Sequence, residues 1–269
     1  MNKIILIITL LLCSLASAQW HRFHYDLVIR KNTDTVRAKT ILDVSEGEVK
    51  FYDEAYIEAD SLRKTGQNIQ VHTETDQLLI RKKGSFHNKT FYAHGYDYFV
   101  ISSEDKINWK IQKETKELQG IILQKATAQY GGRDWIAWFT MIFPIQEGPY
   151  KFRGLPGLII ELYDSEKRFH YWMTKSINLP QKFDTSDFLE VRYGKKPIPI
   201  SLKQYHKIKL DSYHNVVKEL GDFVEKGNSI ASDKELNTKE SILKEKREIQ
   251  QRIKNYHFPL EKDKAIPYP

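Results

Sequence analysis

The chain has 269 residues with 42 Lys or Arg and 35 Asp or Glu, so its formal net charge is +7. Basic residues are scattered among acidic ones and no nucleic-acid-binding motif appears, which argues against nucleic acid as a partner. The single cysteine, Cys13, lies in the N-terminal leader. Without it the chain has no disulfide, thiol chemistry or cysteine-bound metal, and about 250 residues can still bury one sizeable core.

Residues 1–18 have the pattern of a secretory signal peptide. Lys3 precedes the largely apolar run Ile4 to Leu12, and Ala16-Ser17-Ala18 supplies the small residues of a cleavage site before Gln19. We therefore expect an exported protein that is periplasmic, outer-membrane-associated or secreted. The alternative of a membrane anchor is disfavoured because the apolar run is too short to span a bilayer.

Two further expectations follow from the leader. Lipid attachment at Cys13 is a weaker alternative to simple cleavage, because the residues around Cys13 are a poor lipidation context. Loss of Lys3 changes the formal charge from +7 to +6, by subtraction of one, and a positive surplus favours attraction to anionic envelope surfaces. No later segment is long and apolar enough for a transmembrane helix.

Residues 19–178 are predicted to form an antiparallel β-sheet domain. Apolar residues alternate with polar ones, β-branched and aromatic residues are frequent, and turn residues separate the runs. The predicted strands are Phe23–Ile29, Val36–Leu42, Val49–Tyr52, Ile69–Thr73, Gln77–Arg81, Thr90–Ile101, Ile107–Gln112, Leu118–Gln129, Trp135–Phe143, Leu158–Tyr163 and Phe169–Ile177. Glu54–Lys64 is predicted to be a short helix. Without helical crossovers, these strands should pair as an antiparallel meander.

The most informative run is Glu147 to Asp164, which has two turn signals and then an apolar strand. Pro156 and Gly157 suit the two central positions of a type II turn, because Pro fixes φ near −65° and Gly tolerates positive φ. Gly148-Pro149 indicates a second bend just upstream. We expect this run to have a structural role, because it contains no nucleophile, metal-binding motif or phosphate-binding loop.

The run Phe152 to Ile159 resembles the signature of the GLPGLI (Porph_ging) family, envelope proteins of Bacteroidota without an established function. The signature residues are Gly154, Leu155, Pro156, Gly157, Leu158 and Ile159. Gln119–Thr127 and Gly132–Thr140 resemble two further segments of that family, although Leu123 stands where many relatives have Cys. The resemblance implies a compartment and a β-rich fold, with no reaction attached.

Residues 179–269 are predicted to be a helical C-terminal part. Ser201 and Gln204 have capping-box spacing at the start of a helix that extends to about residue 226. A second, highly charged helix is predicted from Asp233 to Tyr256. A many-stranded sheet needs a cover for its apolar face, so we expect a strongly curved, half-barrel-like antiparallel sheet that is partly covered by the helix near residues 201–226.

Aromatic and basic residues near the signature are the candidates for ligand contact. The aromatic candidates are Trp135, Trp138 and Tyr150, and the basic candidates are Arg133, Lys151 and Arg153. Neighbouring residues of a strand point to opposite faces, so one set of rings is expected in the core and the other set on a platform for an apolar, glycan or peptide ligand. The plainer interpretation is core packing, with Gly131-Gly132 as a hairpin turn and Arg133 paired to a nearby acid.

Catalytic and metal-binding patterns are weak. The nine histidines include no His-Glu-x-x-His motif, and no Gly-x-Ser-x-Gly elbow is present, so neither a cofactor nor a metal is expected. Glu161 and Asp164 are a candidate carboxylate pair if the fold buries them together.

Three hypotheses remain open. The first is a non-enzymatic envelope protein that binds an apolar, lipid-like or peptide ligand, or an envelope partner. The second is a periplasmic hydrolase that uses carboxylate and histidine side chains converging in a concave pocket. The third is a scaffold protein that contacts other envelope proteins through a sheet edge.

Overall fold

The computed structural model describes residues 20–216 except 33, 68, 70, 72, 74, 76 and 193, together with residues 218 and 239–269. The predicted signal peptide lies outside the described residues, and so do residues 219–226 of the first predicted C-terminal helix and residues 233–238 of the second. The chain divides into two compact units, Met1–Pro199 and Ile200–Pro269. Each unit is described by itself.

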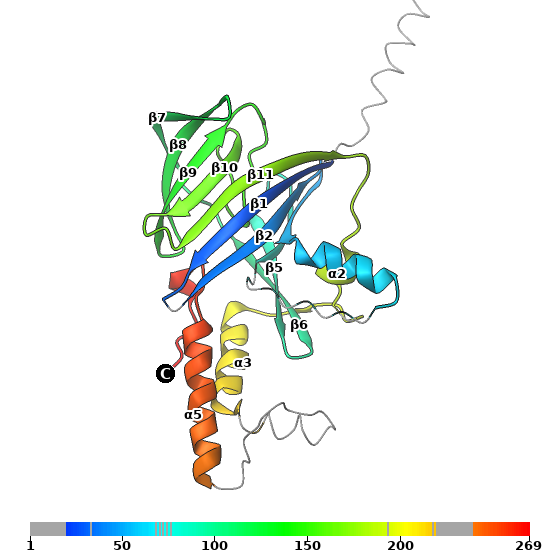
Figure 1. Cartoon of the computed structure of the whole chain (residues 1–269), viewed down its shortest axis with the longest axis vertical. Coiled ribbons are helices and arrows are strands. Elements are labelled where there is room, and N and C mark those ends of the chain that lie inside the picture. Colours follow the sequence, from blue (N-terminus) through cyan, green and yellow to red (C-terminus); the bar gives the residue numbers. More distant parts are fainter. Residues whose placement is uncertain are drawn as a thin grey trace, which may run out of the picture. The chain divides into compact units, whose positions relative to one another are not determined.

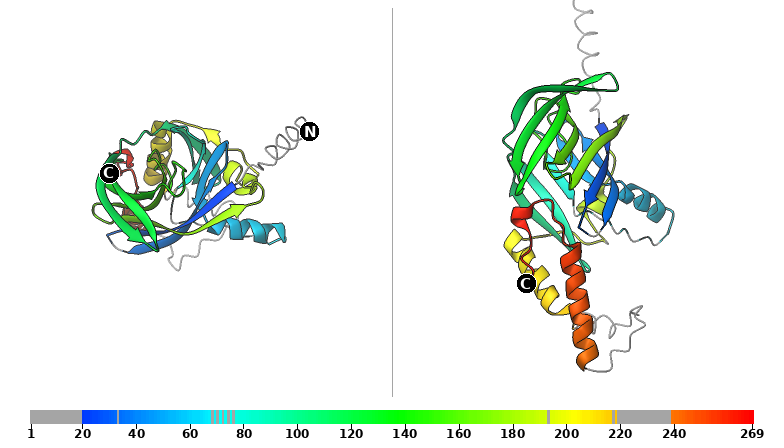
Figure 2. Two further views of the ribbon diagram at one scale, coloured as in Figure 1. Left: turned by 90° about the horizontal axis from the view of Figure 1, so that it is seen from above. Right: turned by 60° about the vertical axis from the view of Figure 1, so that its left-hand side comes forward.

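The first unit is built on one open sheet of twelve strands, which is strongly curved (Figures 1 and 2). The strands are β1 Trp20–Arg30, β2 Thr35–Val44, β3 Glu48–Asp53, β4 Leu78–Lys82, β5 His87–His94, β6 Asp97–Glu104, β7 Lys110–Leu118, β8 Ile121–Tyr130, β9 Arg133–Thr140, β10 Leu158–Asp164, β11 Phe169–Leu179 and β12 Ile198–Pro199. Their order is β12-β6-β5-β4-β3-β2-β1-β11-β10-β9-β8-β7. The expectation of a mainly β protein with a curved sheet is confirmed. The sheet is mixed because the short β12 runs parallel to β6.

Three strand predictions need correction. The predicted strand Thr90–Ile101 is a hairpin, because Gly95 adopts a φ of 57° and reverses the chain between β5 and β6. Residues 113–117, which lie between the predicted strands Ile107–Gln112 and Leu118–Gln129, belong to the edge strand β7, which ends at Leu118 before the turn Gln119-Gly120. The described residues 69, 71 and 73 lie outside any strand.

The inner face of the sheet carries the largest apolar rows. Phe23 pairs with Leu42, Leu42 with Phe51, and Phe51 with Leu79, and all four side chains are fully buried. Because side chains alternate along a strand, the residues between them point to the opposite, outer face.

The outer face of β2 to β6 is covered within the same unit. Helix α2 (Ala55–Lys64) and the short π-helical turn η1 (Ser186–Glu190) pack against it. Tyr56 of α2 stacks on Phe188 of η1 with ring centroids 5.5 Å apart, and Phe188 also meets Tyr52 of β3 at 5.3 Å. The helix predicted at residues 54–64 is confirmed.

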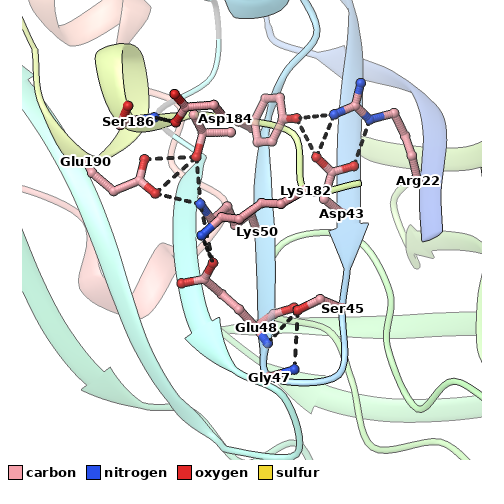
Figure 3. A network of polar contacts seen from close by, with 12 residues as sticks. Arg22, Asp43, Ser45, Gly47, Glu48, Lys50, Lys182, Asp184, Ser186 and Glu190 are labelled. Atoms are coloured by element: carbon pink, nitrogen blue, oxygen red, sulfur yellow. Dashed lines mark hydrogen bonds and ion pairs between the residues drawn. The ribbon is translucent and has the colours of Figure 1, made fainter. Parts of the chain in front are cut away.

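Buried polar contacts hold η1 to the sheet (Figure 3). Lys50 of β3 is buried on the outer face, where its Nζ donates to Thr185 Oγ1 at 2.7 Å and forms an ion pair with Glu190. Next to it, Arg22 donates twice to Asp43, with both distances 2.7 Å. Charge pairing of this kind lets charged side chains lie under the covering segment without an unpaired charge.

The second unit contains helices α3 (Leu202–His214) and α5 (Lys239–Tyr256) and the short turn η2 (Lys262–Lys264). The predicted capping box of Ser201 and Gln204 is present at the start of α3. Tyr213 ties the unit together, because its hydroxyl donates to Pro269 O at 3.1 Å and its ring lies 5.1 Å from that of Tyr268. That α3 covers the sheet stays a prediction. Among the helices in the described residues, none combines the length and apolar character needed to cross a membrane.

Candidate functional site

The segment that joins β9 to β10 folds back into the inner face of the sheet and carries the signature. Arg81 of β4 donates to the Tyr150 carbonyl at 2.7 Å and forms an ion pair with Glu147. Glu147 also accepts from Arg153 at 3.2 Å. One carboxylate therefore links two guanidinium groups in the interior, and all of these side chains are buried.

An aromatic cluster packs around the same segment. The Phe152 ring lies 4.4 Å from Trp135 and 5.6 Å from Tyr130, and Tyr150 meets Phe51 of β3 at 6.2 Å. The interior of the curved sheet is thus packed by side chains of the signature segment and of β9, which leaves the concave face as core.

Five of the six predicted ligand candidates belong to this core. Arg133, Trp135, Tyr150, Lys151 and Arg153 are all less than a tenth exposed. Lys151 and Arg153, predicted as ligand contacts, lie in the interior, where Lys151 pairs with Asp105 at 3.2 Å and Arg153 pairs with Glu147. Arg133 pairs with Asp164 at 2.8 Å, as the plainer interpretation predicted, and Gly131-Gly132 is a turn.

Trp138 is the exception, since it lies half-buried on the outer face. It pairs with Glu161 across β9 and β10, and Lys116 lies 4.5 Å above its ring. The Oε1 atom of Glu161 lies 2.8 Å from His170 Nε2, and the same carboxylate forms an ion pair with Lys116. This surface is a network of mutually satisfied side chains.

The signature glycines act differently from the predicted type II turn. Gly154 takes the left-handed conformation with φ of 98°, whereas Gly157 is absent from the positive-φ residues. Gly157 is instead required by close approach, because a Cβ there would lie 2.0 Å from the Thr140 carbonyl oxygen. Leu155, Leu158 and Ile159 are buried, and Pro156 is exposed.

The candidate carboxylate pair does not come together. Asp164 faces inward to Arg133 and accepts from Phe169 N at 3.0 Å, while Glu161 points to the outer face. In the part of the chain that the structure describes, no group of three or more His, Cys, Asp or Glu side chains could hold a metal ion.

One end of the sheet exposes a group of large apolar side chains, which we call the apolar tip. Its members are Leu118, Ile122, Met141 and Ile142, with exposed fractions of 43%, 66%, 65% and 61%. Gln124 of β8 pairs with Phe139 of β9, and Ile122 and Met141 each lie two positions further toward that end. Leu118 pairs with Ile121, the neighbour of Ile122, and Ile142 follows Met141 in the chain. Exposed apolar clusters mark contact with an apolar partner more often than isolated exposed residues do.

The signature holds one half of the apolar tip in place. Leu158 N donates to Phe143 O at 3.2 Å, and Ile159 N donates to Glu147 O at 3.0 Å. The backbone contact of Gly157 with Thr140 fixes the point where the chain leaves β9 for Met141 and Ile142. The signature therefore determines how this apolar segment is presented.

A polar cleft of about 700 Å³ lies on the outer face, between β1, β2 and the start of α2. His24 of β1 lies in it with Nδ1 3.0 Å from Glu54 Oε1. Sequence reasoning missed this pair because 30 positions separate the two residues. The available signal was the acidic run Asp53-Glu54 at the end of β3, where a strand turns into a helix.

These features define a class: a mainly β protein with one large open sheet, a packed inner face and a polar cleft on the outer face. Two structures of PNGF-II, in the C2 and P21 space groups, are similar to it, each with a TM-score of 0.52 and 13% sequence identity over 71% of this chain. The match covers 32% and 33% of those chains, so this chain spans about a third of their length. At this identity the likeness concerns the fold.

The signature segment is similar to a known sequence family. The sequence model of a family described as "Protein of unknown function (Porph_ging)" matches residues 132–161, which include β9 and the signature. This match confirms the resemblance to the Porph_ging family. No curated protein matches the chain.

Proposed function

We propose that this protein is an exported, non-enzymatic envelope protein that attaches to a lipid surface through the apolar tip. The observation that carries the proposal is the position of the exposed apolar residues. Among the described residues of the sheet unit, the large exposed apolar side chains are Tyr96, Ile111, Leu118, Ile122, Met141, Ile142 and Ile198. Four of these seven form the apolar tip.

Two physical arguments favour a lipid surface as the partner. Transfer of apolar side chains from water into an apolar phase is favourable by about 25 cal/mol per Å² of area removed from water, so the four side chains together provide several kcal/mol. The predicted mature chain also carries a formal charge of +6, and binding at a membrane interface depends on buried apolar area plus attraction to anionic lipids.

The other hypotheses have weaker support. The edge strand β7 carries Lys110, Lys113 and Lys116 together with Glu114 and Glu117, and charges on an edge strand oppose pairing with another chain. The hydrolase hypothesis is favoured by one observation, the His24–Glu54 pair in a cleft. It would require turnover of ester, amide or glycoside substrates that is lost in His24→Gln.

The experiment is sedimentation of the chain from residue 19 onward with vesicles of phosphatidylethanolamine and phosphatidylglycerol. We expect binding to the vesicles, and we expect Ile122→Ser with Met141→Ser to weaken it about tenfold or more. The matched control is Tyr96→Ser with Ile198→Ser, which removes two exposed apolar side chains of the same unit outside the apolar tip.

Equal losses in both double variants would overturn the proposal, because binding would then depend on general hydrophobicity. So would vesicle binding that is unchanged in the tip variant. Self-association that depends on Ile122 and Met141, measured by analytical ultracentrifugation without lipid, would replace the lipid surface by a second copy of the chain.

A further inference from the structure

The cleft beside α2 has oppositely charged walls. Its basic residues come from the sheet, at positions Arg22, Arg37 and Lys39. Its acidic residues come from the end of β3 and the start of α2, at positions Asp53, Glu54 and Glu58. A volume of about 700 Å³ falls within the range of about 300–1,000 Å³ that small-molecule sites occupy.

His24 holds the Glu54 carboxylate at the acidic wall, with Nδ1 3.0 Å from Glu54 Oε1. A carboxylate can only accept, so the Glu54 contact places the imidazole proton on Nδ1 and leaves the lone pair on Nε2. Nε2 is buried and has no hydrogen-bond partner in the described part of the protein. Burial lowers the pKa of His24, and Arg22 and Lys175 lower it further, while Glu54 acts in the opposite direction. The neutral, accepting form is therefore favoured.

The basic wall has side chains that extend into solvent. Arg37 and Lys39 are exposed, whereas the guanidinium of Arg22 is engaged by Asp43 and by the Tyr52 hydroxyl oxygen at 3.0 Å. An anionic group in the cleft would thus be bound by Arg37 and Lys39. On the other wall, Glu58 is exposed and lies one helical turn from Glu54.

We propose that this cleft binds a small zwitterion, whose ammonium group lies against the carboxylates of Glu54 and Glu58, while its anionic group pairs with Arg37 and Lys39. Carboxylates at one wall and cations at the other specify both ends of such a ligand. Free amino acids and short peptides have this chemistry, and so does the phosphoethanolamine headgroup of a lipid.

The test is a titration of the mature chain by isothermal calorimetry with defined probes. One arm uses the free dipeptides Ala-Ala, Lys-Ala, Glu-Ala and Phe-Ala, and the other uses phosphoethanolamine. Binding in either arm supports the zwitterion site and identifies the source of the ligand. For a dipeptide that binds, N-acetylation and C-terminal amidation should each weaken binding about tenfold or more, because each removes one of the two charges.

Variants at exposed positions keep the test independent of folding. Arg37→Gln and Glu58→Gln should each weaken binding about tenfold. The controls Lys113→Gln and Glu104→Gln change exposed charges elsewhere on the sheet and should leave binding unchanged.

The proposal is overturned if no probe binds at millimolar concentration, if blocked dipeptides bind as well as free ones, or if Arg37→Gln and Glu58→Gln bind normally. The outcome is independent of the apolar tip. Ile122→Ser with Met141→Ser should leave zwitterion binding intact. Arg37→Gln with Glu58→Gln should leave binding to vesicles of phosphatidylglycerol alone intact, because these contain no phosphoethanolamine headgroup.

Discussion

Gly157 and Thr140 touch backbone to backbone, because a Cβ at position 157 would lie 2.0 Å from the carbonyl oxygen of Thr140. This contact joins the end of β9 to the residue before β10, and it brings the exposed apolar segment that starts at Met141 against the signature. By this packing contact the signature fixes the position of the neighbouring apolar tip.

Replacement of Gly157 by Ala should destabilise the sheet unit by about 1–3 kcal/mol or more, because the clash is with backbone that cannot rotate away. Urea unfolding followed by tryptophan fluorescence measures this loss. The control is Gly47→Ala, where a Cβ meets nothing within 4 Å and φ is not in the left-handed region. If the two variants were equally stable, the close approach would have no energetic role.

Replacement of Glu147 by Gln should cost about 3–5 kcal/mol, because it leaves the buried guanidinium groups of Arg81 and Arg153 without their shared carboxylate. The free energy of unfolding in urea is the measurement. Glu166→Gln, which removes an exposed carboxylate 3.6 Å from Arg168, should cost less than about 1 kcal/mol. A small loss in Glu147→Gln would mean that water compensates the two arginines.

Features set by local sequence were predictable. Alternation of apolar residues located most strands, because a period of two reports directly which face a side chain takes. The spacing of Ser201 and Gln204 gave the capping box of α3, since that motif is contained within four residues.

Features set by tertiary contact were not predictable from one sequence. A glycine that permits positive φ and a glycine that permits close approach look alike in sequence, so Gly157 was assigned the role that Gly154 fulfils. Lys151 and Arg153 appeared to be a surface patch because their acidic partners are far away in sequence or carried on the same buried loop. Burial of a charge depends on such partners, and one sequence does not reveal them.

The ion pairs of Glu161 should make stability depend on pH. The hydrogen bond from His170, together with Lys116, holds the pKa of Glu161 below its ordinary value of 4.5. The folded protein therefore keeps this carboxylate ionised at a pH where the unfolded chain binds a proton. The stabilisation is complete above about pH 4.5 and is lost as the pH falls through the lower folded pKa.

Comparison of the wild type with Glu161→Gln measures this effect. The difference in unfolding free energy should be on the order of 1 kcal/mol near neutral pH and should shrink well below pH 4.5. In a His170→Asn background the same replacement should have a smaller effect at every pH, because the main hydrogen bond is already absent. A difference that grows on acidification would contradict the assignment.

Lys50 should stabilise η1, the segment that covers the outer face of the sheet. Lys50→Gln removes the ammonium group that contacts Thr185 and Glu190, so we expect a loss of about 2 kcal/mol and faster amide hydrogen exchange in η1. Exchange measured by mass spectrometry resolves this segment from the strands beneath it. Lys182→Gln is the control, since Lys182 is mostly exposed and lies 3.7 Å from Glu48. If exchange in η1 were the same in both variants, the aromatic packing of Phe188 on Tyr52 and Tyr56 would be sufficient to hold the cover in place.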